Sequence, residues 1–403
     1  MNFIDGGVCA AKGFKANGIH CGIRKNRTKK DLALIVSEVK ASAAAVYTTN
    51  LVKGAPIFVT KKHIADGFAQ AMICNSGNAN TCNADGIEIA DKMSKLTADA
   101  LGISENDIII ASTGVIGQRL DITPIENGMP ELVAGLDKNS DFAAQAILTT
   151  DTVKKEVAVS FEIDGVQCRM GGIAKGSGMI HPNMATMLVF ITTDCAITSE
   201  MLQTALSTDV QSTFNMVSVD GDTSTNDMVS IMANGMAQNR VIDCEGEAFK
   251  TFMKALNTVC TNLCRMIAGD GEGATKLLEC CVTGAKTESI SKIVAKSVIC
   301  SSLTKAAMFG ADANWGRVLC AIGYSGADVD VNKIDVSFKS DKGEISVCKN
   351  GAGIEFSEDI AKKILLEKEI VINVDLNDGE YSSKAWGCDL TYDYVKINGD
   401  YRT

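Results

Sequence analysis

The stretch "EVAVSFEIDGVQCRMGGIAKGSGMIHPNMATMLVFITTD", residues 156–194, joins three patterns that decide how this chain folds. Apolar residues alternate along 157–163 and again along 166–170, and the Asp-Gly pair between them suits a turn with positive φ. A glycine-rich loop follows, after which Met187 to Ile191 are all apolar. The stretch therefore predicts a β-hairpin, a loop and a buried strand, with Thr186 at the junction of loop and strand.

Strand-like and helix-like patterns alternate on both sides of this stretch. Residues 31–38 are typical of a buried strand, and the β-branched run in 106–117 predicts a strand that leads into a glycine loop, whereas 86–102 carry apolar residues at helical spacing. Towards the C-terminus short strands dominate, with one helix near 357–368 for which Ser357 is a suitable N-cap. We therefore expect an α/β protein with a smaller C-terminal α/β portion from about 290–330 onward.

Composition excludes several classes of protein. The chain has 403 residues, 46% of them hydrophobic and 22% charged, which is typical of a globular protein of two or three domains. A formal net charge of −10 argues against a nucleic-acid-binding protein. No apolar run approaches the roughly 18 residues of a membrane span, and the N-terminus lacks a secretory pattern. These observations predict a cytoplasmic protein.

The cysteines do not indicate a metal centre. There are 15 of them, scattered and odd in number, with three histidines in the chain and no CxxC pair. Zinc sites use closely spaced Cys and His ligands, so we expect no metal and read the thiols as reduced, buried side chains.

Thr186 has two explanations at this level. β-Branched residues are common where strands begin, so its position has an ordinary structural reading. A threonine becomes a nucleophile only beside a base. His181 is one candidate, and the other is the α-amine of Thr186 itself, which has a pKa of about 8 once the Ala185–Thr186 bond is cleaved. The residues alone leave both open.

Motifs along the whole chain resemble those of the ornithine acetyltransferase family, which acts in arginine biosynthesis. The most specific is "AKGSGMIHPNMATML" at 174–188. The segments "ASTGVIGQRL", "LTTDTVKK", "SVDGDTSTND", "GDGEGATK" and the terminal "INGDYRT" also occur in the family's order.

The resemblance implies a precursor that cleaves itself into an α chain, 1–185, and a β chain, 186–403, which stay together as an α2β2 assembly. It also implies a layered α/β sandwich with an N-terminal-nucleophile-type self-cleaving core. In such enzymes the threonine takes the acetyl group of N-acetylornithine and passes it to glutamate by a ping-pong scheme. No cofactor is required, although some members also accept acetyl-CoA.

Site residues follow from the resemblance position by position. Thr113 and Gly114 match the pair that forms the oxyanion hole. Lys175 matches a substrate-binding lysine, whose ammonium suits the α-carboxylate of both amino acids. Glu272 matches a glutamate whose charge complements the substrate's ammonium groups. Thr149 matches a substrate-binding threonine.

Other positions complete this prediction. Thr150 and Thr152 are close enough in the chain to take the role of the substrate-binding threonine. Asn398 and Thr403 match ligand contacts at the C-terminus, so we expect the tail to fold into the site. The sequence departs from the family pattern at positions without a catalytic role, such as Thr304, where Val is usual.

Two other functions remain as alternatives. An N-terminal-nucleophile amidohydrolase or aminopeptidase would pass the acyl group to water. A non-catalytic amino-acid-binding protein would retain the scaffold alone.

Overall fold

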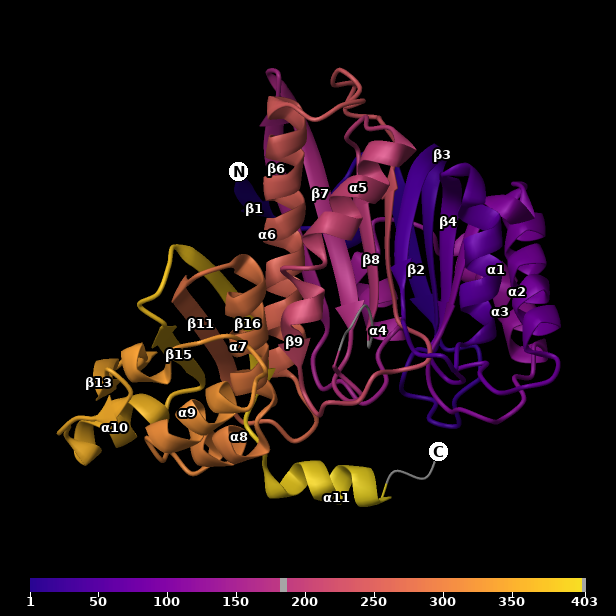
Figure 1. Ribbon diagram of the computed structural model, residues 1–403. Helices are drawn as coiled ribbons and strands as arrows, with labels where there is room; N and C mark the ends of the chain where they lie inside the picture. The colour runs from indigo at the N-terminus through magenta and orange to yellow at the C-terminus, as the bar shows by residue number, and fades with distance from the viewer. Residues whose placement is uncertain (182–186, 401–403) are drawn as a thin grey trace.

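A computed structural model describes residues 1–181 and 187–400 of the chain. They form two β-sheets, of nine and seven strands, with helices packed on their faces (Figure 1). The chain is thus a layered α/β protein, as the sequence predicts.

The larger sheet has the strand order β1-β6-β7-β8-β10-β3-β4-β5, and β2 also pairs with β3. The β8–β10 and β4–β5 pairs are parallel, whereas the other pairs are antiparallel. Its strands are β1 (Asn2–Ile4), β2 (Phe14–Ile19), β3 (Leu32–Tyr47), β4 (Phe68–Asn75), β5 (Ile108–Ser112), β6 (Lys155–Ile163), β7 (Val166–Lys175), β8 (Leu188–Thr193) and β10 (Met228–Ala233).

The smaller sheet has the order β14-β13-β12-β15-β11-β16-β9. Its strands are β9 (Val217–Ser218), β11 (Leu277–Ala285), β12 (Asp335–Ser340), β13 (Gly343–Lys349), β14 (Ala352–Gly353), β15 (Glu369–Asp375) and β16 (Tyr381–Cys388). Strands β9 and β11 belong to this sheet although they come before residues 290–330 in the chain. The residue at which a smaller C-terminal portion begins stays a prediction.

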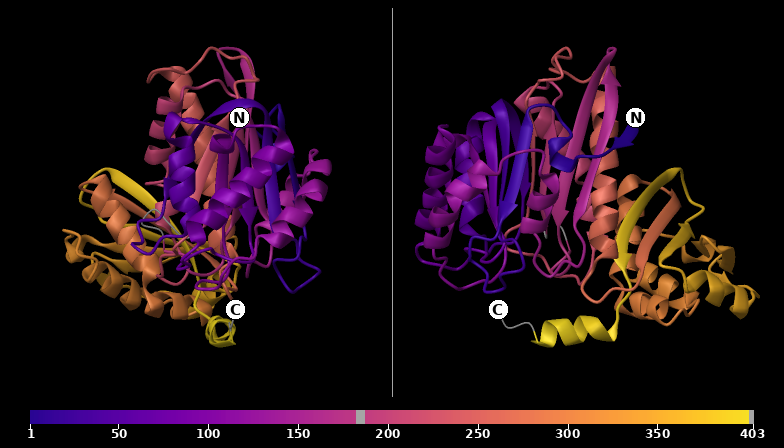
Figure 2. Two further views of the ribbon diagram at one scale, coloured as in Figure 1. Left: turned by 90° about the vertical axis from the view of Figure 1, so that its right-hand side faces the viewer. Right: turned by 180° about the vertical axis from the view of Figure 1, so that it is seen from behind.

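The helices cover both sheets. They are α1 (Ala55–His63), α2 (Gly86–Leu101), α3 (Thr123–Ala134), α4 (Ser140–Ala146), α5 (Ser199–Asp209), α6 (Glu247–Gly269), α7 (Glu288–Cys300), α8 (Ser302–Phe309), α9 (Trp315–Gly323), α10 (Glu358–Leu365) and α11 (Tyr392–Asp400). Helix α6 packs on β6 and β7 and also contacts β11 and β16, so it joins the two sheets. Helix α11 leaves the smaller sheet and runs beneath the end of the larger one (Figures 1 and 2).

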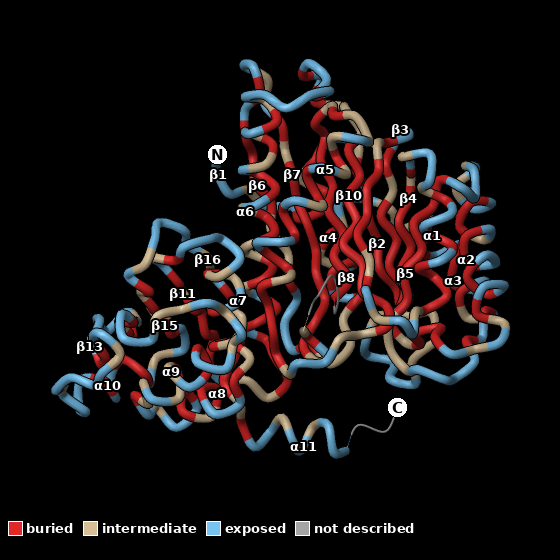
Figure 3. The backbone as a smooth tube through the Cα atoms, in the orientation of Figure 1, coloured by how far each residue is buried: buried red, intermediate tan, exposed pale blue. Residues whose placement is uncertain are grey.

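The predicted hairpin and strand are confirmed at the centre of the larger sheet. Strands β6 and β7 pair from Ile163 and Val166 outward, around Asp164 and Gly165 with φ values of 50° and 82°. Strand β8 is buried along its whole length (Figure 3). Both of its faces are covered, which explains its continuous apolar run at 188–191. On one face Val189 and Ile191 pack with α5 and α6, and on the other Leu188 and Phe190 pack with the core beneath α4.

The other local predictions also agree with the structure. Residues 86–101 form α2, residues 108–112 form β5, and the Ser357 side chain accepts a hydrogen bond from Ile360 N–H at the start of α10. No helix within 1–181 and 187–400 is long and apolar enough to cross a membrane.

Candidate active site

A cavity of about 300 Å³ lies where β5 and β7 end, where β8 begins and where α11 passes. Met187, at the start of the second described range, contributes to its wall. Every predicted site residue that the structure describes lines this cavity, namely Thr113, Gly114, Thr149, Lys175, Glu272 and Asn398. The predictions for Ala185, Thr186 and Thr403 fall outside the described residues.

The Thr113–Gly114 turn follows directly on β5. Thr113 N–H donates to Asn75 O at 2.9 Å, which fixes the turn against the end of β4. Gly114 has φ +129°, and a Cβ there would lie 2.6 Å from the carbonyl carbon of Gly77, so only glycine fits. Within the described ranges the Gly114 N–H makes no hydrogen bond. This turn can therefore present a free amide to the cavity.

Lys175 is the last residue of β7, and the sheet register pairs it with Leu188 of β8. Its side chain is 8% exposed and lines the cavity. Among the described residues its ammonium group forms no direct ion pair. A buried cation of this kind favours an anionic ligand group, such as a carboxylate.

Glu272 lies in the loop between α6 and β11 and binds α11. Its carboxylate Oε2 accepts a hydrogen bond from Asn398 Nδ2 at 2.8 Å. A Cβ at Gly178 would lie 2.4 Å from this carboxylate, so the glycine allows the two segments to approach each other. The Thr391 hydroxyl donates to Gly273 O at 2.7 Å, which fastens the start of the helix. The C-terminal helix thus contributes to the wall of the cavity.

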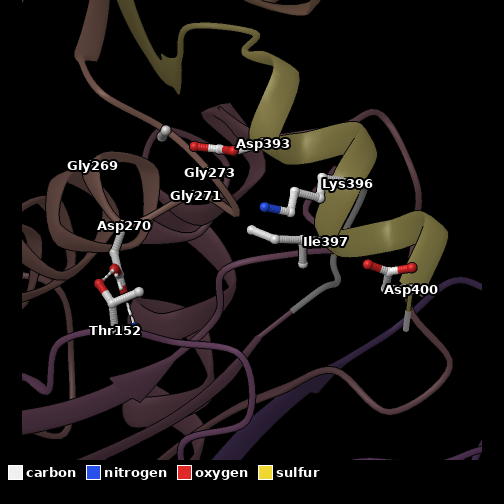
Figure 4. Close-up of a pocket in the computed structure, with 10 residues that line it drawn as sticks. Thr152, Gly269, Asp270, Gly271, Gly273, Asp393, Lys396, Ile397 and Asp400 are labelled. Carbon is white, nitrogen blue, oxygen red and sulfur yellow. Dashed lines mark hydrogen bonds between the residues drawn. The ribbon is translucent and has the colours of Figure 1, made fainter. Parts of the chain in front are cut away.

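The three candidate threonines separate in space. Thr149 and Thr150 line the cavity beside Lys175. Thr152 instead lines a neighbouring cleft of about 430 Å³ beneath α11, where its backbone N–H donates to the Asp270 carboxylate at 3.1 Å (Figure 4). The position of Thr152 therefore fits the substrate-binding role less well than the other two.

The His181 side chain contacts Ser218 and Cys300 and does not line the cavity. Its Nδ1 lies 3.1 Å from Ser218 Oγ and 3.5 Å from Cys300 Sγ, and its carbonyl accepts a hydrogen bond from Thr223 Oγ1. Burial, and after it the charge of Lys296, lowers the pKa of the imidazole to about 4. A neutral imidazole with so low a pKa is a weak base at pH 7, which favours the α-amine over His181 as the base for Thr186.

Sequence reasoning overlooked Asn226. Its amide Nδ2 donates to Ala79 O at 2.6 Å and to Ser112 O at 2.9 Å, and its Oδ1 accepts from the Thr81 hydroxyl at 2.6 Å. It thereby joins the loops around the cavity, of which it forms part of the wall. Only its place in the "SVDGDTSTND" motif could have drawn attention to it. In the described part of the chain no group of three or more His, Cys, Asp or Glu side chains is arranged to hold a metal ion.

Comparisons with known proteins agree with one another. The sequence model of the ArgJ family matches residues 15–403. The "Arginine biosynthesis bifunctional protein ArgJ" of Caldanaerobacter subterraneus subsp. tengcongensis is 51% identical, with both chains fully covered. "ArgJ 1" of Clostridium acetobutylicum is 49% identical over 97% of this chain and 96% of its own. The crystal structure of the arginine biosynthesis bifunctional protein argJ from Bacillus halodurans is 49% identical with a TM-score of 0.51, over 54% of this chain and 100% of the solved one.

Proposed function

Because this chain belongs to the ArgJ family, we propose that it transfers the acetyl group of N2-acetylornithine to glutamate in arginine biosynthesis. The proposal rests on one observation about specific residues. The free amide of Gly114, Lys175 and Glu272 come from distant segments and line one cavity, beside the strand that follows Thr186. These are the groups that acyl transfer between two amino acids requires.

The first half-reaction forms an acetyl-enzyme. The α-amine of Thr186 takes the proton of its own hydroxyl while Oγ1 attacks the acetyl carbonyl carbon of N-acetylornithine. The Thr113–Gly114 turn stabilises the oxyanion, to which one such donor typically contributes about 2.7–4 kcal/mol. The C–N bond then breaks, the amine of ornithine receives the proton, and acetyl-Thr186 remains.

The second half-reaction regenerates the threonine. The amine of glutamate attacks the ester carbonyl, the bond to Oγ1 breaks and the hydroxyl takes back a proton. Lys175 and Thr149 bind the α-carboxylate that both substrates carry, whereas Glu272 and Asn398 meet the side-chain ammonium group of N-acetylornithine. The α-carboxylate contacts thus serve donor and acceptor, as a ping-pong exchange requires.

The nucleophile arises by cleavage of the Ala185–Thr186 bond into chains 1–185 and 186–403. Strands β8 and β10 of the second chain lie between β7 and β3 of the first, so backbone hydrogen bonds hold the two together. An α2β2 assembly completes the proposal.

Acetyl-CoA is a second acetyl donor in this proposal, because the similar proteins are named bifunctional. The enzyme would then also make N-acetylglutamate without N-acetylornithine. The test measures whether free thiol is released from acetyl-CoA when glutamate is added. If release does not exceed the Thr186→Ala background, the enzyme only transfers acetyl groups from N-acetylornithine to glutamate. No other cofactor takes part.

A cytoplasmic location is also proposed. All 15 cysteines lie within the described ranges as free thiols, which suits a reducing compartment. Fractionation of cells that express the tagged chain should recover it in the cytoplasm.

The decisive experiment compares wild type with Thr186→Ala. Scaling 42.6 kDa by 185/403 and 218/403 predicts fragments of about 20 and 23 kDa from wild type only. Wild type should turn N-acetylornithine and glutamate into ornithine and N-acetylglutamate. Release of acetate instead of N-acetylglutamate would indicate an amidohydrolase. A wild-type chain that is intact and still active would exclude the free-amine mechanism. An active Thr186→Ala protein would indicate a site that does not use this threonine.

A further inference from the structure

A buried ion cluster lies behind the wall of the cavity. Lys155, the first residue of β6, is 0% exposed and pairs with Asp151 Oδ1 at 2.7 Å and with Asp270 Oδ2 at 2.6 Å. Its third hydrogen-bond partner is Val153 O at 3.3 Å. The ammonium group thus uses all three of its donors inside the protein.

The first carboxylate fastens two parts of the cavity wall. Asp151 accepts hydrogen bonds from Thr149 N–H at 3.0 Å and from Gly176 N–H at 2.7 Å. Gly176 directly follows Lys175, so one carboxylate fixes the backbone at both residues proposed to bind the substrate's α-carboxylate. A single side chain therefore sets the spacing between them.

The second carboxylate extends the cluster to the loop of Glu272. The Asp270 carboxylate accepts hydrogen bonds from the backbone N–H and the hydroxyl of Thr152 on the wall of the neighbouring cleft (Figure 4). Its backbone carbonyl accepts from the Ser177 hydroxyl at 2.7 Å, and Ser177 O accepts from Glu272 N–H at 3.0 Å. The Lys155 cluster thus joins the segments that carry Thr149, Lys175 and Glu272.

Charge keeps the Asp151 carboxylate ionised. Burial would raise the pKa of the Asp151 carboxyl, but the charges of Lys155 and Lys175 outweigh it and hold that pKa well below its usual range. Buried ion pairs contribute little net stability compared with apolar groups of the same shape, and their best-attested use is to fix geometry. Here the hydrogen bonds of the Asp151 carboxylate end on the cavity wall, and those of Asp270 end on Thr152 and Val153 beside the neighbouring cleft.

We propose that Asp151, Lys155 and Asp270 are positioning residues for substrate binding, which set the geometry of Thr149 and Lys175 for the α-carboxylate. The proposal rests on the acetyl-transfer function above. The oxyanion turn is fastened separately, through Thr113 N–H and Asn75 O. Loss of the cluster should therefore weaken binding of both amino acids more than it slows the chemical step.

The test is steady-state kinetics of Asp151→Asn in the full, processed protein. The KM values for N-acetylornithine and glutamate should both rise about tenfold, because both carry the α-carboxylate, with kcat within about threefold of wild type. A merely structural role would lower the melting temperature and the fraction of active enzyme, neither of which changes KM.

Asp209→Asn is the matched control. Asp209 is also buried and accepts from Asn257 Nδ2 at 2.8 Å, but it lies at the end of α5, away from the cavity. It should leave both KM values unchanged. Asp151→Asn with wild-type KM values, or Asp209→Asn with raised ones, would overturn the proposal.

Ser177→Ala provides a second variant that changes no charge. It removes the hydrogen bond to Asp270 O and should raise both KM values about threefold. If Asp151→Asn does not fold, unchanged KM values in Ser177→Ala overturn the proposal. If the wild-type enzyme transfers no acetyl group, the proposed function is wrong. If the wild-type enzyme is active but the variants leave both KM values unchanged, only the positioning role is wrong.

Discussion

Replacing Thr304 by valine should stabilise the protein. Its side chain is 1% exposed in α8, and its hydroxyl has no hydrogen-bond partner in the described part of the chain. Its backbone N–H is already satisfied by Ser301 Oγ at 3.2 Å, so the substitution leaves the helix cap intact. Valine keeps the branched shape and removes the unpaired hydroxyl.

The magnitude follows from burial. An unsatisfied buried hydroxyl costs about 1–3 kcal/mol, and an added buried methyl group contributes up to about 0.8 kcal/mol, so we expect a gain of about 1–4 kcal/mol in the free energy of unfolding. Unfolding entropies near 2.1 cal/mol/K per residue give about 0.85 kcal/mol/K for this chain, so Tm should rise by about 1–5 °C.

Thermal and urea unfolding of Thr304→Val beside Thr60→Val provides the assay. Thr60 is equally buried, but its hydroxyl donates to Ile110 O and accepts from Ile110 N–H, both at 2.8 Å. The same substitution there leaves two backbone groups unpaired and should destabilise by about 1–3 kcal/mol. Shifts of the same sign in both variants, or a lower Tm for Thr304→Val, would refute the reasoning.

Further predictions concern the cavity and pH. Gly114→Ala places a Cβ 2.6 Å from the Gly77 carbonyl carbon and should lower kcat about 100-fold or more in single-turnover assays; a change below threefold would contradict the oxyanion role. Asn398→Ala removes the hydrogen bond to Glu272 and should raise KM about fivefold in initial-rate assays, whereas an unchanged KM would separate α11 from substrate binding. The pKa of His181 is about 4 in the folded protein and near 6.5 in the unfolded chain, so between these pH values the folded state binds fewer protons than the unfolded state. The free energy of unfolding therefore falls as pH drops from about 6.5 towards about 4. His181→Gln should lose less stability than wild type over that window in urea titrations at pH 7 and pH 5, and equal losses would contradict the assignment.

Local elements were predictable because their signals are local. The alternation along 157–163 and the Asp164-Gly165 turn specify the β6–β7 hairpin, and Ser357 marks the start of α10. The pairing of β8 with β10 was not predictable, because the two strands are separated by α5 and by a long loop, and no periodicity records which strand lies beside which.

The site divides in the same way. Lys175 and Glu272 were predicted as site residues from their motifs, and both line the cavity, although isolated Lys and Glu residues would ordinarily be solvated. The Lys155 cluster was missed because its parts are far apart. Asp151 and Lys155 are four residues apart, but Asp270 reaches Lys155 from 115 residues away, which only the folded chain reveals.

The strand order has a consequence for how the enzyme can be remade after denaturation. A precursor folds with β7, β8, β10 and β3 in one chain, so its refolding rate is independent of protein concentration. With the proposed cut before Thr186, β8 and β10 would have to find their places between strands of a separate polypeptide. Recovery would then be a bimolecular encounter that slows on dilution, so the two proposed chains would reach this fold most readily before the cut separates them.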